Sequence, residues 1–231
     1  MIFETAFSEV IHRTPAVRSF RFDRPDGFDY EAGQFMYVTI ETAGGRMIKH
    51  FTISSSPSEG YLEFTKLLTE SDFSKGLEAV EAQDWVGVNG PYGSFTLEPD
   101  QGKIAMLCGG IGITAFRSMI KCWFDYDLDN DIVLLYSCGT FDEIVFREEL
   151  DEMTRRREGL RVFYTLTREG DWWEGERGRI DGEKIRRLIP DHEEGLCYVC
   201  GPQAMVEAVT AVLRSVGVPG NRIKREGFTG Y

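Results

Sequence analysis

The sequence predicts two domains of different class: an N-terminal all-β antiparallel barrel and a C-terminal α/β domain with a parallel sheet. Two observations support this division. Short β-favouring runs separated by turn residues extend to about Leu97, and apolar strands alternate with helices after Asp100. A chain of 231 residues suits one large domain or two small ones. We therefore expect domains at 1–98 and 102–231, with the boundary in the segment between them.

The N-terminal half contains four β-favouring runs with turn residues between them. Aromatic and β-branched residues dominate the runs, and Gly-Gly and Gly-Pro pairs punctuate them, which is typical of an antiparallel barrel or sandwich. One helix is expected at Phe73–Ala82, with Leu77 and Val80 on one face. The predicted strands are Phe35–Ile40, His50–Ile53, Tyr61–Thr65 and Trp85–Val88.

The C-terminal half has near-continuous apolar strands, which indicates a parallel sheet that is covered on both faces. The predicted strands are Lys103–Cys108, Asp131–Tyr136, Leu160–Leu166 and Leu196–Cys200. Helices are expected between and after them, at about Thr114–Asp125, Phe141–Arg157, Asp181–Leu188 and Gln203–Val216.

Composition and charge exclude several functional classes. The formal charge of −12 argues against nucleic acid and anionic membranes as partners. The longest uncharged stretch, 104–116, is short of the ~20 residues that span a bilayer, and the first ten residues do not resemble a signal peptide. Five sparse cysteines favour a reducing compartment, so we expect a cytoplasmic protein. Cys197 and Cys200 fall on opposite faces of a predicted strand, so no metal site is expected.

A glycine-rich turn, Cys108–Thr114, directly follows the first strand of the second half and opens a helix. Glycines let backbone amides approach a ligand, and a helix N-terminus favours an anion such as a pyrophosphate. The turn lacks the lysine of a P-loop and the full spacing of the common dinucleotide fingerprint. A purely structural role stays open, because tight strand-to-helix turns need glycine in any case.

Four segments in order resemble motifs of the ferredoxin–NADP+ reductase family. Lys49–Ser55 is similar to the flavin motif Arg-x-Tyr/Phe-Ser/Thr-x-x-Ser, and Gly90–Phe95 to the turn that closes the flavin barrel. Gly109–Thr114 is similar to the nucleotide loop Gly-Gly-x-Gly-x-Thr-Pro, and Cys200–Met205 matches the segment Cys-Gly-Pro-x-x-Met beside the nicotinamide. The resemblance covers nearly the whole chain and implies FAD on the barrel and NAD(P)H on the α/β domain.

On the flavin side, the resemblance implies that Phe51 packs on the isoalloxazine and that Thr52 lies near N5. Lys49 would meet the pyrophosphate in place of the usual arginine, and we expect looser FAD binding because lysine lacks the planar fork. His50 either adds charge when protonated or is an ordinary strand histidine. Ser74 would clamp the pyrophosphate, while Ser71 or Asp72 could simply cap a helix. The other flavin-binding residues implied are Ile53, Phe64, Thr65, Lys66 and Phe73.

On the nucleotide side, the resemblance implies a pyrophosphate site made by Gly109, Gly110, Gly112 and Thr114. Thr167 and Arg168 would meet a 2′-phosphate, which favours NADPH slightly even though Glu169 and Asp171 are near. The segment beside the nicotinamide comprises Cys200, Gly201, Pro202 and Met205. The tail 226–231 would return to the flavin, with Glu226 near the nicotinamide pocket and Phe228 near the ring.

The resemblance implies an FAD-dependent NAD(P)H oxidoreductase. Hydride would pass from the nicotinamide to flavin N5 between the catalytic residues Thr52, Cys200 and Glu226. No ferredoxin, globin or molybdenum domain is visible in the sequence, so we expect a separate electron acceptor, such as a ferredoxin, a flavodoxin or an oxygenase component. Two alternatives stay open: a reductase of free flavin or ferric chelates, and a subunit that holds FAD for electron transfer in a larger complex.

Overall fold

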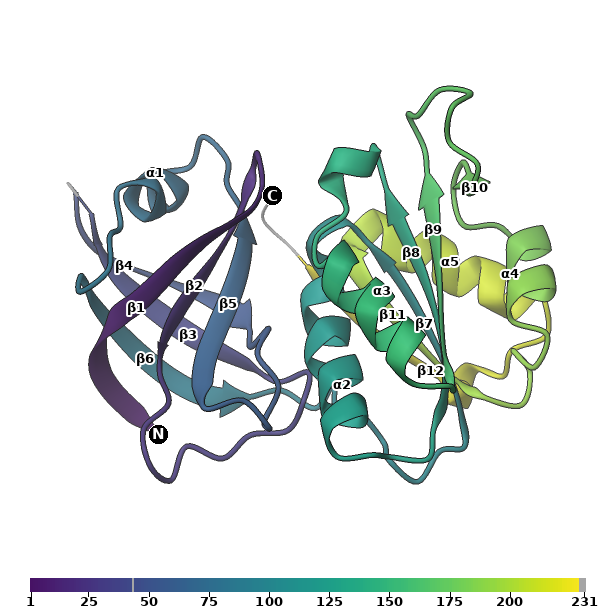
Figure 1. Cartoon of the computed structure of the whole chain (residues 1–231), viewed down its shortest axis with the longest axis horizontal. Helices are drawn as coiled ribbons and strands as arrows, with labels where there is room; N and C mark the ends of the chain where they lie inside the picture. Colours follow the sequence, from purple (N-terminus) through teal and green to yellow (C-terminus); the bar gives the residue numbers. More distant parts are fainter. Residues whose placement is uncertain (43, 229–231) are drawn as a thin grey trace. The chain divides into compact units, whose positions relative to one another are not determined.

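The computed structural model describes residues 1–42 and 44–228, which form two compact units (Figure 1). The first unit comprises Met1–Leu97 and Thr114–Asp125, and the second comprises Glu98–Ile113 and the described residues from Tyr126 onward. The end of the predicted tail, 229–231, lies outside the described residues. No helix in the described part of the chain is long and apolar enough to cross a lipid bilayer.

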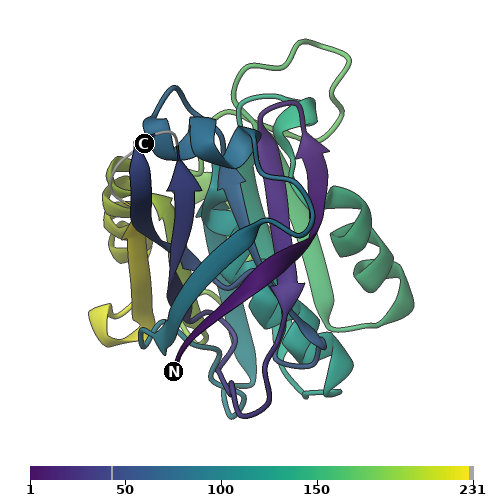
Figure 2. The same ribbon diagram turned by 90° about the vertical axis from the view of Figure 1, so that its left-hand side faces the viewer.

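The first unit is a six-stranded antiparallel sheet with the strand order β4-β3-β6-β1-β2-β5, which confirms the predicted class (Figure 2). Ile53, which directly follows edge strand β4, forms an isolated antiparallel bridge with Phe64 of the other edge strand, β5. The short helix α1 (Asp72–Glu78) lies at one end of the sheet. The strands are β1 (Ile2–Thr14), β2 (Val17–Asp23), β3 (Phe35–Thr42), β4 (Gly45–Thr52), β5 (Tyr61–Leu67) and β6 (Trp85–Tyr92).

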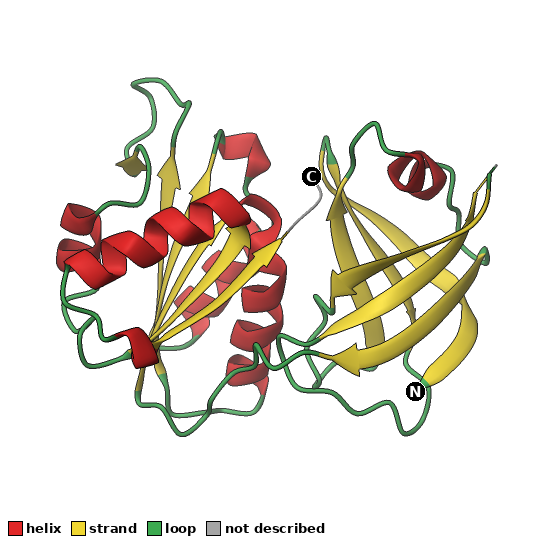
Figure 3. Ribbon diagram, turned by 180° about the vertical axis from the view of Figure 1, so that it is seen from behind, coloured by secondary structure: helices red, strands yellow, loops and turns green. Residues whose placement is uncertain are grey.

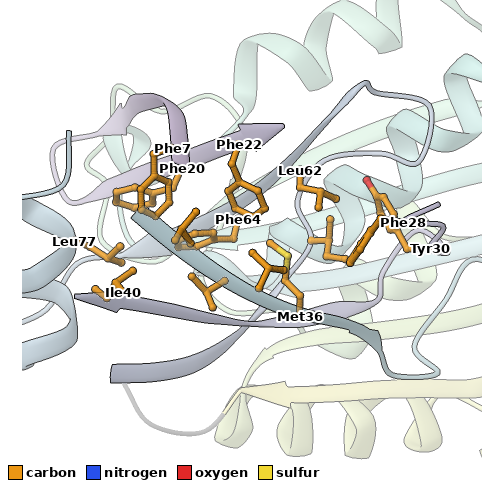
Figure 4. Close-up of a cluster of buried hydrophobic side chains, with 14 of the residues drawn as sticks. Phe7, Phe20, Phe22, Phe28, Tyr30, Met36, Ile40, Leu62, Phe64 and Leu77 are labelled. Atoms are coloured by element: carbon orange, nitrogen blue, oxygen red, sulfur yellow. The ribbon is translucent and has the colours of Figure 1, made fainter. Parts of the chain in front are cut away.

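An aromatic core fills the interior of this sheet (Figure 4). Phe20 stacks on Phe64 with ring centroids 5.1 Å apart, and Phe7 packs against both rings. Leu77 of α1 is fully buried in the same cluster and Val80 packs against it, as the helical spacing predicted. Burying these large apolar side chains stabilises the sheet.

The second unit is a six-stranded sheet with the order β10-β9-β8-β7-β11-β12, in which every pairing is parallel. Figure 3 shows the long helix α5 crossing one face. Apolar residues of β7, β8 and β11 pack there against α4 and α5. The strands are β7 (Lys103–Gly109), β8 (Asp131–Cys138), β9 (Leu160–Leu166), β10 (Glu176–Arg177), β11 (Leu196–Pro202) and β12 (Ile223–Phe228).

The observed helices are α2 (Ile113–Asp125), α3 (Arg147–Arg156), α4 (Gly182–Leu188) and α5 (Gln203–Ser215). The predicted start of a helix at Phe141 is wrong. A short 3-10 turn at Phe141–Glu143 is followed by Phe146 in the left-handed region (φ 60°), and only then does α3 begin. The helix predicted to reach Ala82 ends at Glu78, because Ala79 already caps it. The sequence did not single out β1, β2, β10 or β12.

Candidate functional site

Two lysines on the edge strands of the first unit carry positive charge without a carboxylate partner among the described residues. Lys49 lies on β4 and is exposed, and Lys66 lies on β5 and is half-buried. Burial lowers the pKa of Lys66, and the charge of Lys49 lowers it further, so the two ammonium groups lie close together. Such a pair is stabilised by a bound anion, and a pyrophosphate supplies one.

The ring of Phe51 lies beside these cations. Lys66 Nζ lies 6.0 Å from its centroid, and the ring stacks on Phe64 with centroids 4.7 Å apart. Phe51 is only partly buried, whereas Phe64, Phe73 and Ile53 are wholly or almost wholly buried. These three residues lie in the core and support Phe51, and their contact with the cofactor stays a prediction.

Two other predicted flavin-binding residues, Ser74 and Thr65, form hydrogen bonds within the protein. Ser71 caps α1 as the alternative interpretation predicted, and its Oγ lies 3.0 Å from the Oγ of the buried Ser74. The buried Thr65 has its Oγ1 2.7 Å from Ser19 Oγ and 2.9 Å from Ser54 Oγ. Thr65 therefore lies in a polar network inside the sheet and offers no free hydroxyl to a ligand.

Lys49, Phe51, Lys66 and Ser74 all lie in the first unit. His50 lies in the same unit, but its side chain faces away from Lys49 and Phe51. His50 pairs with Tyr37 across β3 and β4, and its ring lies 5.5 Å from that of Phe35. Because side chains alternate along a strand, His50 lies on the opposite face of β4 from its neighbours Lys49 and Phe51. It matches the ordinary strand histidine of the second interpretation.

A buried ion pair that the sequence did not reveal supports the end of the flavin motif. Arg117 of α2 donates to Ser54 O (3.1 Å) and to Glu59 Oε1 (2.9 Å). Burial acts to raise the pKa of Glu59, but hydrogen bonds and charge from Arg117 outweigh it and the pKa is lowered. Ser118 Oγ also donates to Ser55 O, at 2.6 Å. Side chains of α2 thus hold the backbone that follows β4.

Two positions in the glycine turn after β7, Gly110 and Gly112, favour glycine for different reasons. Gly110 has a left-handed backbone (φ 52°), and no heavy atom lies within 4 Å of where its Cβ would be. A Cβ at Gly112 would lie 2.7 Å from the carbonyl carbon of Cys200, so this glycine permits close packing on β11. The structural role left open by the sequence is therefore real at Gly112, while Gly110 leaves space beside its backbone.

Gly109 and the segment after β11 lie against each other at the carboxyl edge of the parallel sheet. A Cβ at Gly201 would lie 3.0 Å from Gly109 O, and the Met205 side chain lies next to both glycines. Pro202 precedes the first residue of α5 and pairs with Phe228 of β12. Thr114 is buried in the first turn of α2.

Cys200 and Glu226 are directly paired on neighbouring strands at the same edge. The Oε2 of Glu226 is buried and has no hydrogen-bond partner among the described residues. Burial raises the pKa of Glu226 to about 7, and burial together with the Glu226 charge raises that of Cys200 well above its usual range. A carboxyl that is half protonated near neutral pH can accept a hydrogen bond from the N–H of a carboxamide or, when protonated, donate one to its oxygen.

Thr167 and Arg168 follow β9 at this edge, and both are engaged within the protein. Thr167 Oγ1 donates to Cys138 O (3.3 Å), and Arg168 forms an ion pair with Glu143, which follows β8. Sequence reasoning missed Glu143. The sequence signal that could have identified it was an acidic residue shortly after β8, the strand next to β7 and its glycine turn.

Models of known families match both units. An oxidoreductase FAD-binding domain matches residues 6–97, and an oxidoreductase NAD-binding domain matches residues 106–211. The chain is 32% identical to a glycine betaine monooxygenase reductase subunit of Chromohalobacter salexigens over 95% of its own length. It spans only 62% of that relative's length.

Two further proteins match over nearly their full length. A ferredoxin–NADP reductase B of Sorangium cellulosum is 28% identical, with 98% of this chain and 97% of that protein covered. The crystal structure of a ferredoxin NADP+ reductase from Neisseria gonorrhoeae with bound FAD and NADP has a TM-score of 0.86 at 21% identity, and 98% of each chain is covered. This last likeness shows a common fold. With an FAD-binding domain followed by an NAD-binding domain, the chain belongs to the ferredoxin–NADP+ reductase family of oxidoreductases.

Proposed function

We propose that the protein is a flavin-dependent NAD(P)H oxidoreductase that passes electrons to a separate acceptor. The observation that carries this proposal is the presence, in one chain, of an FAD-binding and an NAD-binding oxidoreductase domain. Domain boundaries at 98 and 102 belong to the same proposal, and the interval between the two family matches, 98–105, supports them. All five cysteines are free thiols, which supports a cytoplasmic location.

The residues of the first unit fit FAD. Lys49 and Lys66 would hold its pyrophosphate, because they place two positive charges together without a carboxylate to neutralise them. Phe51 would pack against the ring system, since its own ring is backed by Phe64 and stays partly exposed. When bound, FAD supplies the redox chemistry: it accepts a hydride from the nicotinamide and releases electrons to the acceptor.

The residues of the second unit fit a nicotinamide dinucleotide. Gly109, Gly110 and Gly112 would present backbone amides to its pyrophosphate. Glu226 would hold the carboxamide, because its buried Oε2 lacks a partner that such a group provides. Cys200 presents a small uncharged side chain next to Glu226, since burial keeps its thiol protonated. Thr52, in the other unit, would offer its hydroxyl to the hydride-accepting atom of the flavin.

An oxygenase component is the acceptor that we propose. The relative from Chromohalobacter salexigens is named as the reductase subunit of a monooxygenase, which supports this choice over a small-molecule acceptor. The protein's own work in this scheme is to position two cofactors and exclude water from the transfer.

An anaerobic titration followed by visible spectroscopy tests the proposal. We expect a purified protein with bound flavin whose absorbance is bleached by a near-stoichiometric amount of NADH or NADPH. A flavoprotein that neither dinucleotide bleaches would indicate an electron-transfer subunit instead. A colourless protein that binds FAD only weakly would indicate a reductase of free flavin. A protein that binds no flavin at all would refute the proposal.

A further inference from the structure

The first sheet has an aromatic and apolar outer face where it is formed by β1, β3, β4 and β6. These strands are neighbours in the order β4-β3-β6-β1 (Figure 2). One row of directly paired residues crosses all four strands and consists of His50, Tyr37, Asn89 and Ile2. Residues that pair across antiparallel strands lie on the same side of the sheet. The row faces outward, because Met36 and Val38 on either side of Tyr37 belong to the core.

A cluster of rings occupies the centre of this face. The ring of Tyr37 makes edge-on contacts with those of His50 and Tyr92, at centroid distances of 5.9 and 5.6 Å. Phe35 lies 5.9 Å from both Tyr37 and Tyr92. The hydroxyl of Tyr92 also donates a hydrogen bond to Asn89 Oδ1 at 2.8 Å. Rings that are already held in place lose little freedom on binding, and such aromatic residues dominate the binding energy of protein interfaces.

We name this surface the aromatic face and define it by Ile2, Phe35, Tyr37, Ile48, His50 and Tyr92. Ile48 belongs to it because it lies two residues before His50 on β4. Seven large apolar side chains are exposed in the described part of the chain, and four of them belong to this face.

The exposed area of these four side chains is large. Ile2 is 78% exposed, Ile48 61%, Tyr92 41% and Tyr37 39%. Since large side chains present ~150–250 Å² each, together they expose roughly 400 Å² of apolar surface. A patch of this size is among the largest that a typical monomer shows, and such patches are often binding sites.

The outer face of β2 and β5, in the same sheet, is polar instead. Arg21 of β2 donates to Glu63 of β5 at 2.7 Å and to Glu9 of β1 at 2.9 Å. Antiparallel sheets ordinarily direct polar residues outward in this way. The aromatic face is therefore a local departure that calls for a partner surface.

The charges around the aromatic face suit a second copy of the chain. The face contains no acidic or basic residue apart from His50, although the whole chain carries a formal charge of −12. Two copies of so acidic a chain repel each other least across an uncharged surface. The rim carries both signs: Arg46 forms an ion pair with Glu41 at 3.2 Å, and Trp85 Nε1 donates to Glu4 at 3.1 Å. Such a rim can pair with its own copy about a twofold axis.

We propose that the aromatic face is the interface of a homodimer, in which the first sheets of two copies pack face to face about a twofold axis. Four antiparallel strands from each copy allow the aligned packing of two sheets that is found in β-sandwiches. When the partly exposed rings of Phe35 and Trp85 and the charged rim are included, the surface approaches the ~800 Å² per partner that a stable interface buries.

An electron acceptor suits this face less well than a second copy does. The aromatic face lies on the opposite side of β4 from Lys49 and Phe51, which would contact FAD. An acceptor bound there would have the sheet between itself and the flavin, whereas a second copy needs no access to the flavin. This choice of occupant rests on the proposed function.

Sedimentation velocity of the full chain with FAD, over a range of protein concentrations, tests the inference. Tyr37→Glu places a negative charge from each copy in the interface, and Ile48→Glu does so at a second position. Tyr126→Glu is the matched control, because it makes the same substitution at a tyrosine that is 55% exposed outside the aromatic face. Circular dichroism verifies that each variant is folded.

We expect the wild-type protein and Tyr126→Glu to be dimers with a Kd in the micromolar range or tighter. Tyr37→Glu and Ile48→Glu should each weaken association by about 100-fold or more, because they bury like charges without a partner. Folded variants that keep the wild-type Kd would overturn the inference. Wild-type protein that stays monomeric at about 100 μM would also overturn it, and would leave a different protein, such as the electron acceptor, as the occupant. A dimer whose flavin neither dinucleotide bleaches would refute the proposed function and still support the interface.

Discussion

Replacing Glu226 with glutamine removes a carboxyl of the candidate site whose pKa is strongly raised. Its Oε2 is buried without a partner among the described residues, and burial raises its pKa from 4.5 to about 7. The folded protein therefore holds a proton on Glu226 more tightly than the unfolded chain does. Each pH unit between these two pKa values lowers the free energy of unfolding, because the unfolded chain releases a proton that the folded protein retains.

The size of the effect follows from the shift. The folded pKa lies above the unfolded one, so stability is fully present below pH 4.5 and is lost as the pH rises to about 7. At ~1.4 kcal/mol per pH unit, the raised pKa costs the folded protein roughly 1 kcal/mol at pH 5, where only the unfolded chain ionises, and roughly 3 kcal/mol at pH 8.5, where the carboxyl is charged in both states. The neutral amide avoids this cost at both pH values. Glu226→Gln should therefore raise Tm by about 2–4 °C at pH 5 and by about 6–12 °C at pH 8.5.

Thermal unfolding followed by circular dichroism at the two pH values measures this difference. Glu174→Gln is the matched control, because it makes the same substitution at an exposed position of the same unit. An increase for Glu226→Gln that is the same at pH 5 and pH 8.5 would refute the reasoning, since an uncharged packing effect has no such pH dependence. A decrease in Tm at pH 8.5 would show that the carboxylate has a stabilising partner.

Three further predictions follow from single contacts. Lys66→Met should weaken FAD binding by about 10–100-fold, because a charge-assisted contact is lost, whereas the exposed Lys75→Met should not; a fluorescence titration with FAD measures both. Gly112→Ala should lower the free energy of unfolding by about 1–3 kcal/mol in chemical denaturation, and an unchanged midpoint would contradict the close packing described for this glycine. Arg117→Ala should cost about 3–5 kcal/mol at pH 7 because it leaves the mostly buried carboxylate of Glu59 without its cation, and Arg117→Ala/Glu59→Gln should recover part of that loss.

The sequence predicted elements whose pattern is local. The strands β7, β8, β9 and β11 are continuous apolar runs bounded by breakers, and buried parallel strands require that composition. The four family motifs were equally visible, because each is a contiguous segment such as Gly109–Thr114. The start of α3 was misplaced, because the left-handed backbone of Phe146 carries no signature in its composition.

Pairs of residues far apart in the chain were decided only by the tertiary structure. Lys49 and Lys66 lie near each other although they belong to the two edge strands of the first sheet. Glu143, after β8, forms an ion pair with Arg168, after β9, and Glu226 of β12 pairs with Cys200 of β11. Strand β12 carries Glu226 and lacks the apolar run that identified its neighbours, so its pairing depends on register with β11. Local sequence thus determined which residue types each segment offers, including the glycine turn and the flavin motif. Burial and strand order then determined their chemistry, because a carboxyl or an ammonium acquires its pKa and its partner only from the groups that folding places beside it.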